Sequence, residues 1–263
     1  MVSKEEAGPW TEGSDKYGRY VADSATSLRF RPLPPGDYVV GLSERERQAA
    51  YRISSQPQWS VNELTPTLNV RIDSSFVAEL PVSCSIARNA GLSVNGEDRA
   101  PAMLTFDEVE VVCSVFGWRP VSEAEWEVCC RGGQQGLFAW GDDLPSQVVL
   151  GEWLSWDMGD PRSPRNDWGF GSIYFGEWCA DQFLVPRNAI GRSADGARVI
   201  KGGGAQFWPW QTGEEWVWCL AAMRMPSSDL FADGRAAFRP GLRASDIGRL
   251  KPPSTARTIE TGA

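Results

Sequence analysis

The sequence predicts an α+β protein with two main helices, small antiparallel sheets and much ordered loop. Alternating apolar residues bounded by prolines and glycines indicate short strands in the first third of the chain. Two segments near the middle, 105–117 and 122–133, carry helix-capping residues at both ends. From Gly136 onward the chain is rich in Gly, Trp, Pro and Asp and has no long helical period. That half is therefore expected to consist of short strands joined by irregular loops.

The strands are expected in two segments. Residues 28–41 alternate, turn at Pro35-Gly36-Asp37 and continue as a short apolar run, which indicates a strand, a turn and a strand. Residues 68–83 alternate again and indicate a second strand pair around Asp73-Ser74-Ser75. The intervening residues 44–66 are polar and loop-like, and we expect at most one helical turn at their start.

The first helix is predicted over residues 105–117. Thr105 can cap its first turn, Glu108 completes a capping box, and Gly117 ends the run. The apolar residues at helical spacing are Val109, Val112, Cys113 and Phe116. Because β-branched valines lose side-chain freedom in a helix, we expect tertiary packing to support this one.

The second helix is predicted over residues 122–133, with Ser122 as N-cap, Glu125 as its capping-box partner and Gly132 as the stop. Glu123, Glu125 and Glu127 resemble an acid–base group, but we interpret them as cap residues and solvent-facing charges. The apolar surface is expected from Trp126, Val128, Cys129 and Cys130. Adjacent cysteines rarely have the geometry of a disulfide, so we place both in the core.

One domain is expected from residue 14 to residue 245. Residues 1–13 are polar and contain Gly and Pro, and are predicted to form a flexible N-terminal arm. Residues 246–263 contain two prolines and small polar residues, and are predicted to form an extended tail.

The composition excludes several classes of site. Among 263 residues there is no His, which excludes His-based zinc sites, facial-triad iron sites and Ser-His or Cys-His nucleophiles. The net charge of −8 argues against nucleic acid or an anionic membrane as the main partner.

The chain is expected to be soluble and cytoplasmic, because it shows neither a signal-peptide pattern nor an apolar run long enough to insert into a membrane. The six cysteines follow no metal-binding spacing, and we expect buried thiols.

Several motifs, taken in order, resemble the formylglycine-generating-enzyme (sulfatase-modifying factor) domain family. The match covers about residues 17–243 and includes "RFRPLPPGDYVVG", "RPVSEAEWEVCCRGG", "DWGFGSIYFGEWCAD", "RVIKGGG" and "RPGLR". The resemblance implies a C-type-lectin-like α+β fold with two main helices, small twisted antiparallel sheets and much ordered loop.

The catalytic residues of this family are missing from the matching positions. In the copper-dependent oxidases of the family, a cysteine pair follows the R-G-G-S motif. Here Phe207 stands near the first cysteine position, Glu215 or Trp216 near the second, and Cys219 is the only thiol of the region. Because copper(I) needs soft ligands, copper oxidase chemistry is expected to be lost. The related iron-dependent sulfoxide synthases use histidines, which this chain lacks.

The resemblance also raises calcium as a cofactor. Family members often bind Ca²⁺ around a G-N-V-W-E-W segment. Tyr174 occupies the Asn position here, whereas Glu177 remains. A Ca²⁺ ion takes six to eight oxygens, so losing one ligand weakens such a site without forbidding it. No other cofactor is expected.

The principal expectation is a catalytically inactive domain that acts as a protein-binding module or as an accessory subunit of a larger complex. Its partner would be a protein or a peptide-like ligand, without nucleic acid or membrane insertion. Tryptophan clusters often mark recognition surfaces, although they also fill cores. The candidate binding residues are Phe207, Trp208, Trp210, Gln211, Trp216 and Trp218.

Two alternatives remain open. The chain could be an oxidoreductase of the same family with a relocated site that acts on a peptide or natural product. Its candidate catalytic residues would be Cys219, Glu215, Glu214 and Glu177, near a tryptophan-lined groove. A minor alternative is a retroelement-diversified variable binding protein, which uses the same fold.

Overall fold

The computed structural model describes residues 10–53, 65–134, 136–155, 157–184, 196–203, 215–229 and 234–247. Five α-helices lie in these residues: α1 (Glu44–Ile53), α3 (Cys84–Asn89), α4 (Phe106–Phe116), α5 (Glu123–Arg131) and α6 (Gln147–Ser155). The strands are β1 (Trp10–Asp15), β2 (Gly18–Asp23), β3 (Arg29–Leu33), β4 (Gly36–Val40), β5 (Leu68–Ile72), β6 (Ser75–Ala78), β7 (Arg119–Pro120), β8 (Glu177–Gln182), β9 (Arg198–Lys201), β10 (Met225–Pro226), β11 (Ala237–Phe238) and β12 (Pro240–Arg243). Short 3-10 turns are η2 (Glu215–Cys219), η3 (Ser227–Asp229) and η4 (Ala244–Ile247).

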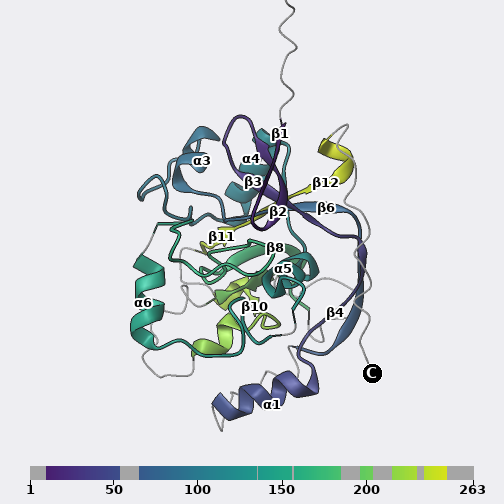
Figure 1. The fold of residues 1–263 in the computed structure, drawn as a ribbon. Helices are drawn as coiled ribbons and strands as arrows, with labels where there is room; N and C mark the ends of the chain where they lie inside the picture. Colours follow the sequence, from purple (N-terminus) through teal and green to yellow (C-terminus); the bar gives the residue numbers. More distant parts are fainter. Residues whose placement is uncertain are drawn as a thin grey trace, which may run out of the picture.

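The described strands form three small sheets. A six-stranded antiparallel sheet has the order β1-β2-β3-β6-β12-β7, and a four-stranded sheet has the order β10-β9-β8-β11. Strand β11 joins β8 in parallel, and β4 pairs with β5 alone. Figure 1 shows α5 and β8 near the middle of the molecule, with α1 and α6 at its periphery. The predicted α+β class is confirmed.

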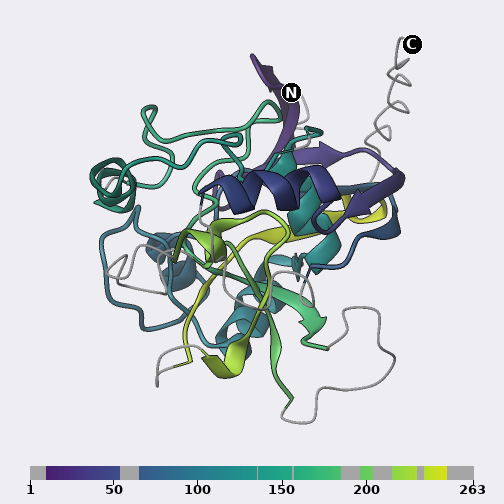
Figure 2. The ribbon, with the colours of Figure 1, turned by 90° about the horizontal axis from the view of Figure 1, so that it is seen from below.

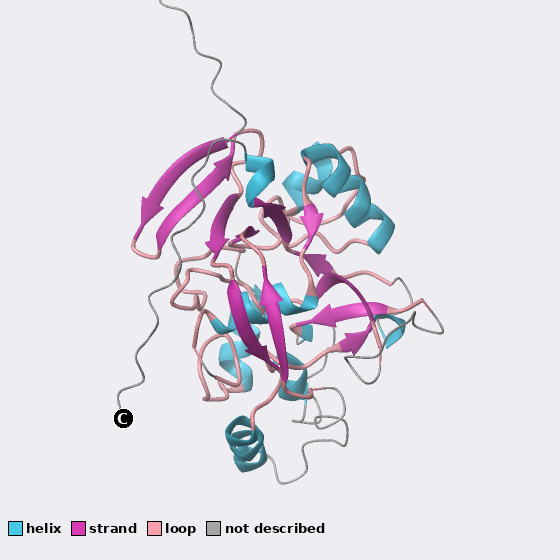
Figure 3. Cartoon of the chain, turned by 90° about the vertical axis from the view of Figure 1, so that its right-hand side faces the viewer, coloured by secondary structure: helices cyan, strands magenta, loops and turns pink. Residues whose placement is uncertain are grey.

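The predicted strands are present, but neither of the two predicted segments folds back on itself as a hairpin. β3 pairs with β6, and β4 pairs with β5. Leu33 faces Ser75 and Gly36 faces Ile72, so both pairings share one register without an inserted residue. The two local hairpins expected from the sequence are therefore wrong. The four strands form one long ladder that is interrupted near its middle. Its lower part, β4 with β5, lies at the right in Figure 1 and faces the viewer in Figure 3.

Prolines explain the interruption of this ladder. Pro34 and Pro35 lie between β3 and β4 and have no backbone N–H to donate across the strands. The chain bends there, and the Tyr38 hydroxyl donates to the Pro34 carbonyl at 2.7 Å. What resembles a turn in the sequence is a break in a continuous strand.

The two predicted helices are confirmed together with their caps. Thr105 and Glu108 form a reciprocal capping box on α4, and Gly117 ends that helix with a φ of 70°. Ser122 and Glu125 form the same box on α5, where Gly132 has a φ of 57°. Both stops use the left-handed conformation that glycine adopts without strain.

Residues 44–53 form a full helix, α1, instead of the single turn expected. Ser43 and Glu46 exchange hydrogen bonds as a capping box: the Ser43 N–H donates to Glu46 at 2.8 Å, and the Glu46 N–H donates to the Ser43 hydroxyl at 3.3 Å. Ala49 and Ala50 pack against the core. Residues 44–53 are too polar to show a strong apolar pattern in the sequence, so the helix depends on this packing for its stability. Figure 2 shows α1 lying across the lower face.

The carboxylates of α5 are buried, so their predicted solvent-facing position is wrong. Glu123 pairs with Arg224 at 3.0 Å, and Glu125 pairs with Arg119. Glu127 is fully buried and pairs with Arg131 at 3.1 Å and with Lys201 at 3.3 Å. Each carboxylate has a cation because a buried charge without one would be costly. Ser122 and Glu125 also form the predicted capping box, so Glu125 takes part in both the cap and an ion pair.

Helix α5 presents buried residues around most of its circumference and lies in the centre of the core. Trp126, Val128, Cys129 and Cys130 pack with residues of β3 to β6, β8 and β9. All six cysteines are buried thiols, as predicted. In the part of the chain that the structure describes, no helix has the length and apolar character needed to cross a membrane.

The ends of the described chain bear on the predicted domain limits. Strand β1 begins at Trp10, inside the segment predicted as an arm, and Trp10 packs edge-on against Phe30 with ring centroids 5.7 Å apart. At the other end, η4 includes Asp246 and Ile247. Residues 248–263 of the predicted tail lie outside the described residues.

Candidate functional site

Most of the predicted binding residues lie outside the described part of the chain. These are Phe207, Trp208, Trp210 and Gln211, together with Glu214 of the alternative enzyme. Glu215 and Trp216 belong to η2, but only their backbone is described. Their predicted roles stay predictions.

The structure places Cys219 in the core and packs Trp218 against it. The indole of Trp218 is partly buried and packs between two hydrophobic clusters. Cys219 is 2% exposed and packs with Leu42, Leu137 and Phe138 among others. A buried thiol cannot contact substrate without a rearrangement of its surroundings, so this position favours a structural role.

Glu177 forms a buried ion pair. Its carboxylate accepts hydrogen bonds from Trp126 Nε1 at 2.9 Å and from Arg239 Nε and Nη2 at 3.0 and 2.9 Å. Tyr174, at the former Asn position, donates its hydroxyl to the Trp153 carbonyl. Among the residues that the structure describes, no group of three or more acidic or cysteine side chains could hold a metal ion. Calcium at Glu177 therefore stays a prediction without a described ligand set.

The structure brings together a different set of residues around a cavity of about 310 Å³, which we call the aromatic cavity. Its walls come from the β1–β2 turn, β2, β3, the Pro34 bend, β6 and the loop before β8. The lining residues are Tyr17, Gly18, Arg19, Tyr20, Val21, Arg31, Pro32, Pro34, Phe76 and Trp168. The sequence predicts no site here, because the lining residues come from separate segments that meet only after folding. Arg31, Pro32, Pro34 and Trp168 lie within family motifs, and Tyr17 and Tyr20 lie in the "YGRY" segment, but no local pattern shows that these segments share a cavity.

The hairpin of β1 and β2 places the two tyrosines. Asp15 Oδ1 accepts the Tyr17 N–H at 2.9 Å and so orders the turn. Gly13 faces Tyr20 across the strand pair, and a Cβ on Gly13 would lie 2.4 Å from the Tyr20 ring. Because Gly13 has no Cβ, the Tyr20 ring can lie directly against the backbone at this position.

Asn166 places Trp168. Its side-chain nitrogen donates to the Cys129 and Cys130 carbonyls of α5, at 2.6 and 3.0 Å. Its oxygen accepts the N–H groups of Trp168 and Phe170, both at 3.1 Å. The loop is thus fixed to the C-terminal end of α5, where the Cys129 carbonyl also accepts the Gly132 N–H.

The glycine pair after α5 provides room for this loop. A Cβ on Gly132 would lie 2.7 Å from Asn166, and one on Gly133 would lie 2.7 Å from the Trp168 indole. On the opposite side, a Cβ on Gly169 would lie 2.6 Å from Arg31 Nε. The helix stop and the cavity wall are therefore in direct contact, which links the strongest family motif of the sequence to this site.

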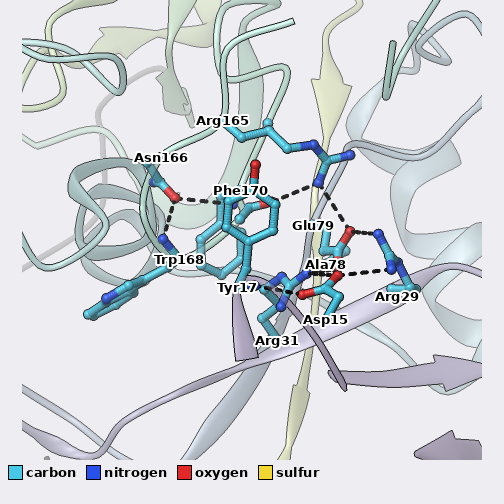
Figure 4. A network of polar contacts seen from close by, with 12 residues as sticks. Asp15, Tyr17, Arg29, Arg31, Ala78, Glu79, Arg165, Asn166, Trp168 and Phe170 are labelled. Atoms are coloured by element: carbon cyan, nitrogen blue, oxygen red, sulfur yellow. Dashed lines mark hydrogen bonds and ion pairs between the residues drawn. The ribbon is translucent and has the colours of Figure 1, made fainter. Parts of the chain in front are cut away.

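A network of five charged side chains lies beneath the aromatic cavity (Figure 4). Arg31, which is 2% exposed, pairs through Nη2 with Asp15 at 2.7 Å and with Glu79 at 2.6 Å. Arg29 bridges the same two carboxylates at 3.1 and 2.8 Å. Arg165 reaches Glu79 at 3.2 Å and the Gly169 carbonyl at 2.8 Å. The network therefore joins β1, β3, the end of β6 and the 165–171 loop.

The charges of this network act on Asp15. Burial acts to raise the pKa of Asp15, but hydrogen bonds from Arg31 and the Tyr17 N–H, with the charges of Arg31 and Arg29, hold that pKa below its ordinary value. The tyrosine rings lie against the guanidiniums: Arg29 is 4.7 Å from the Tyr20 centroid, and Arg31 is 5.3 Å from the Tyr17 centroid. Such cation–π contacts hold each ring at the wall.

A second hollow of about 570 Å³ lies at the bend between β5 and β6. It is lined by Arg71, Arg119 and Arg243 with several serines. Arg119 is already paired with Glu125, and Arg71 with Asp37 at 3.4 Å. The aromatic cavity has the larger apolar surface and the more deeply buried charge, so we treat it as the candidate site.

The sequence matches no model of a known protein family and no curated protein. Solved structures that are similar to the chain include the following two. The Treponema denticola variable protein 1 superposes with a TM-score of 0.57 at 12% identity, over 90% of this chain and 100% of that one. PvdO from Pseudomonas aeruginosa superposes with a TM-score of 0.58 at 15% identity, over 90% of this chain and 99% of that one. Both have the formylglycine-generating-enzyme-like fold, so the C-type-lectin-like fold implied by the motifs is confirmed.

Proposed function

We propose that this chain is a binding module that recognises a protein partner or a peptide-like ligand through the aromatic cavity. The observation that carries the proposal is the wall of the cavity, where Tyr17, Tyr20, Phe76 and Trp168 stand beside two prolines. Tyr and Trp are enriched at recognition surfaces because a rigid ring offers a large contact area at little entropic cost. Grooves lined by such rings accept aromatic and prolyl residues of peptides.

The side chains that line the aromatic cavity favour ligand binding over catalysis. Among the described residues of the cavity wall, none carries a thiol, a carboxylate or an aliphatic hydroxyl. The described candidates of the alternative oxidoreductase, Cys219 and Glu177, are 2% and 0% exposed. The proposal therefore includes catalytic inactivity and use as an accessory subunit, in line with the missing cysteine pair. A variable protein among the structural neighbours is consistent with a stable frame whose surface residues change.

Peptide selection tests this function. Random peptides displayed on phage are selected on the purified chain, and enriched sequences are then measured as synthetic peptides by calorimetry. We expect enriched peptides to share an aromatic or prolyl residue and to bind Trp168→Ala at least about tenfold more weakly, because an anchoring aromatic contributes of the order of 2 kcal/mol.

Tyr51→Ala is the matched control, because Tyr51 is an exposed aromatic residue of α1, 46% exposed and absent from the cavity wall. It should bind like the original chain. Peptides without a shared ring residue, or equal losses in both variants, would contradict a role for the cavity.

A further inference from the structure

The network beneath the aromatic cavity carries one more positive than negative charge. Three guanidiniums, from Arg29, Arg31 and Arg165, face two carboxylates, from Asp15 and Glu79. At the rim, Arg19 is matched by Glu12 at 2.9 Å, whereas Lys16 adds a charge 4.8 Å from the Tyr17 centroid. The whole chain has a net charge of −8, so this positive site differs in sign from the protein that surrounds it.

Arg31 has hydrogen-bonding capacity left at the cavity wall. Its Nη2 is occupied by Asp15 and Glu79, whereas the nearest described acceptor of Nη1 is the Gly18 carbonyl at 3.4 Å. Gly18 and Arg31 both line the cavity. Nη1 carries two N–H groups, so at least one has no described protein acceptor. A guanidinium that is 2% exposed and keeps an N–H donor at a cavity wall can donate a hydrogen bond to an anionic group of a ligand.

Size and charge restrict the ligand further. A cavity of about 310 Å³ is near the lower limit of small-molecule sites, and it accommodates one ring with a short chain. Within the buried network the excess is one positive charge, which one carboxylate balances, while the charge of Lys16 lies exposed at the rim and is screened by solvent. A carboxylate also matches the planar donor geometry of arginine.

We propose, building on the function proposed above, that the aromatic cavity binds an aromatic ring carrying a nearby carboxylate. The ring packs among Tyr17, Tyr20 and Trp168, and the carboxylate accepts hydrogen bonds from Arg31. This chemistry belongs to two sources: the C-terminal aromatic residue of a peptide, and a free aryl carboxylic acid.

Calorimetry with acid and amide pairs tests the inference. The peptide pair is acetyl-Ala-Ala-Phe and its C-terminal amide, and the free-acid pair is 3-phenylpropionate and 3-phenylpropionamide. We expect the acid of at least one pair to bind about tenfold tighter than its amide, because one charge-assisted hydrogen bond is lost in the amide. The pair that binds more tightly identifies the source. Added salt should reduce the preference.

Arg165→Gln removes the excess charge and keeps a side-chain N–H donor near the Gly169 carbonyl. The acid preference, taken as the ratio of acid to amide affinity, should fall to about twofold or less, and the amide affinity itself reports any displacement of the cavity wall. Arg235→Gln is the matched control, because Arg235 also pairs with one glutamate, Glu108, and donates to one carbonyl, that of Met103. It should keep the full preference. Thermal unfolding checks that both variants fold. If Arg165→Gln does not fold, the inference is tested by the salt dependence of the acid preference in the unsubstituted chain.

The outcomes separate this inference from the function on which it rests. Acid and amide binding with equal affinity, or a preference insensitive to salt, would overturn the carboxylate inference and leave the binding module in place. Failure of all four probes, together with failure of peptide selection, would overturn both.

Discussion

Glu177 shows how a single carboxylate joins distant parts of this chain. It begins β8, and its partners are Trp126 of α5 and Arg239 just before β12. Arg239 also donates to the carbonyls of Ala78, Glu79 and Gly171. The pair thus anchors a helix, two sheets and the cavity loop at one point. In the family motif this glutamate suggests a metal ligand, whereas its described contacts are those of a core ion pair.

Glu177→Gln should lower the free energy of unfolding by about 3–5 kcal/mol, because it leaves the buried Arg239 without its counter-charge. Urea unfolding followed by tryptophan fluorescence measures the loss. Glu12→Gln, which breaks an exposed pair with Arg19, should cost less than about 1 kcal/mol. A similar small loss at Glu177 would show that the pair contributes little to stability.

The buried thiols should be inert in the folded protein. Burial raises the pKa of Cys113 and of Cys130 to about 12 and raises the pKa of Cys129 and Cys179 well above its ordinary value. Because the thiolate is the reactive form, Ellman's reagent should modify none of the six cysteines rapidly before denaturation and all of them in guanidinium chloride. Rapid modification of one thiol in the native protein would identify a site that opens.

The surroundings of the α5 carboxylates could not be predicted from the sequence. Cap positions follow from residues three apart in the chain, so Ser122, Glu125 and Gly132 were identifiable. Glu127 has one local partner, Arg131 four residues on, but its second cation is Lys201 and the cation of Glu123 is Arg224, both far along the chain. No local pattern marks such partners, so polar residues on this helix resembled a solvated face.

At the scale of elements, α5 determines the candidate site through its C-terminal end. The Gly132-Gly133 pair stops the helix and admits the 165–171 loop, and the Asn166 amide then donates to the Cys129 and Cys130 carbonyls. The α5 segment, with its three carboxylates and two cysteines, therefore acts as a scaffold. Its influence on the aromatic cavity passes through the position of Trp168.

Gly133→Ala should weaken ligand binding and lower stability more than Gly117→Ala. Both glycines have positive φ, 78° and 70°, so the backbone strain is similar. A Cβ at Gly117 meets open space, whereas one at Gly133 meets the Trp168 indole. We expect an additional loss of about 1–3 kcal/mol for Gly133→Ala from this overlap. Equal melting temperatures and equal peptide affinities for the two variants would contradict the contact.

Acid should weaken the N-terminal end of α5. Burial acts to raise the pKa of Glu125, but hydrogen bonds and charge from Arg119, with the Ser122 N–H, hold that pKa below its ordinary value of 4.5. A lowered folded-state pKa means that the stabilisation is complete above the unfolded pKa and is lost as pH falls through the folded one. The free energy of unfolding should therefore decrease below about pH 4.5. Glu125→Gln should be less stable near neutral pH and show a shallower decrease in urea titrations from pH 7 to 3.

Strand pairing shows the limit of local prediction at this scale. The positions of β3 to β6 follow from alternation, but their partners do not. Prolines and a Gly-Asp pair resemble a hairpin turn, yet here they interrupt a long ladder. The helix α1 was underestimated for a related reason, because its capping box precedes a strongly polar segment that tertiary contacts stabilise.

At the scale of the whole molecule, the fold could be predicted and the candidate site could not. Ordered motifs along most of the chain indicated the formylglycine-generating-enzyme-like fold, which the structural neighbours confirm. The aromatic cavity combines a turn, three strands and a loop that are close only after folding. The binding residues predicted from the sequence lie mainly outside the described residues, so they and the aromatic cavity stay separate hypotheses.

The purified protein should contain neither copper nor iron at stoichiometric levels, because the cysteine pair and all histidines are absent from the sequence. Inductively coupled plasma mass spectrometry on protein from its own host measures both metals and calcium together. One equivalent of copper or iron, with oxygen consumption, would contradict catalytic inactivity. One equivalent of calcium would support the predicted calcium site.

The position of β12 has a consequence for synthesis on the ribosome. This late strand inserts between β6 and β7, and the preceding Arg239 neutralises Glu177. Until residue 243 has left the exit tunnel, β6 keeps an open edge and Glu177 lacks its cation. Such long-range closure is slow and exposes strand edges to aggregation. Nascent chains stalled before residue 239 should therefore recruit chaperones and resist compaction, and release of the last strand should complete folding in one cooperative step.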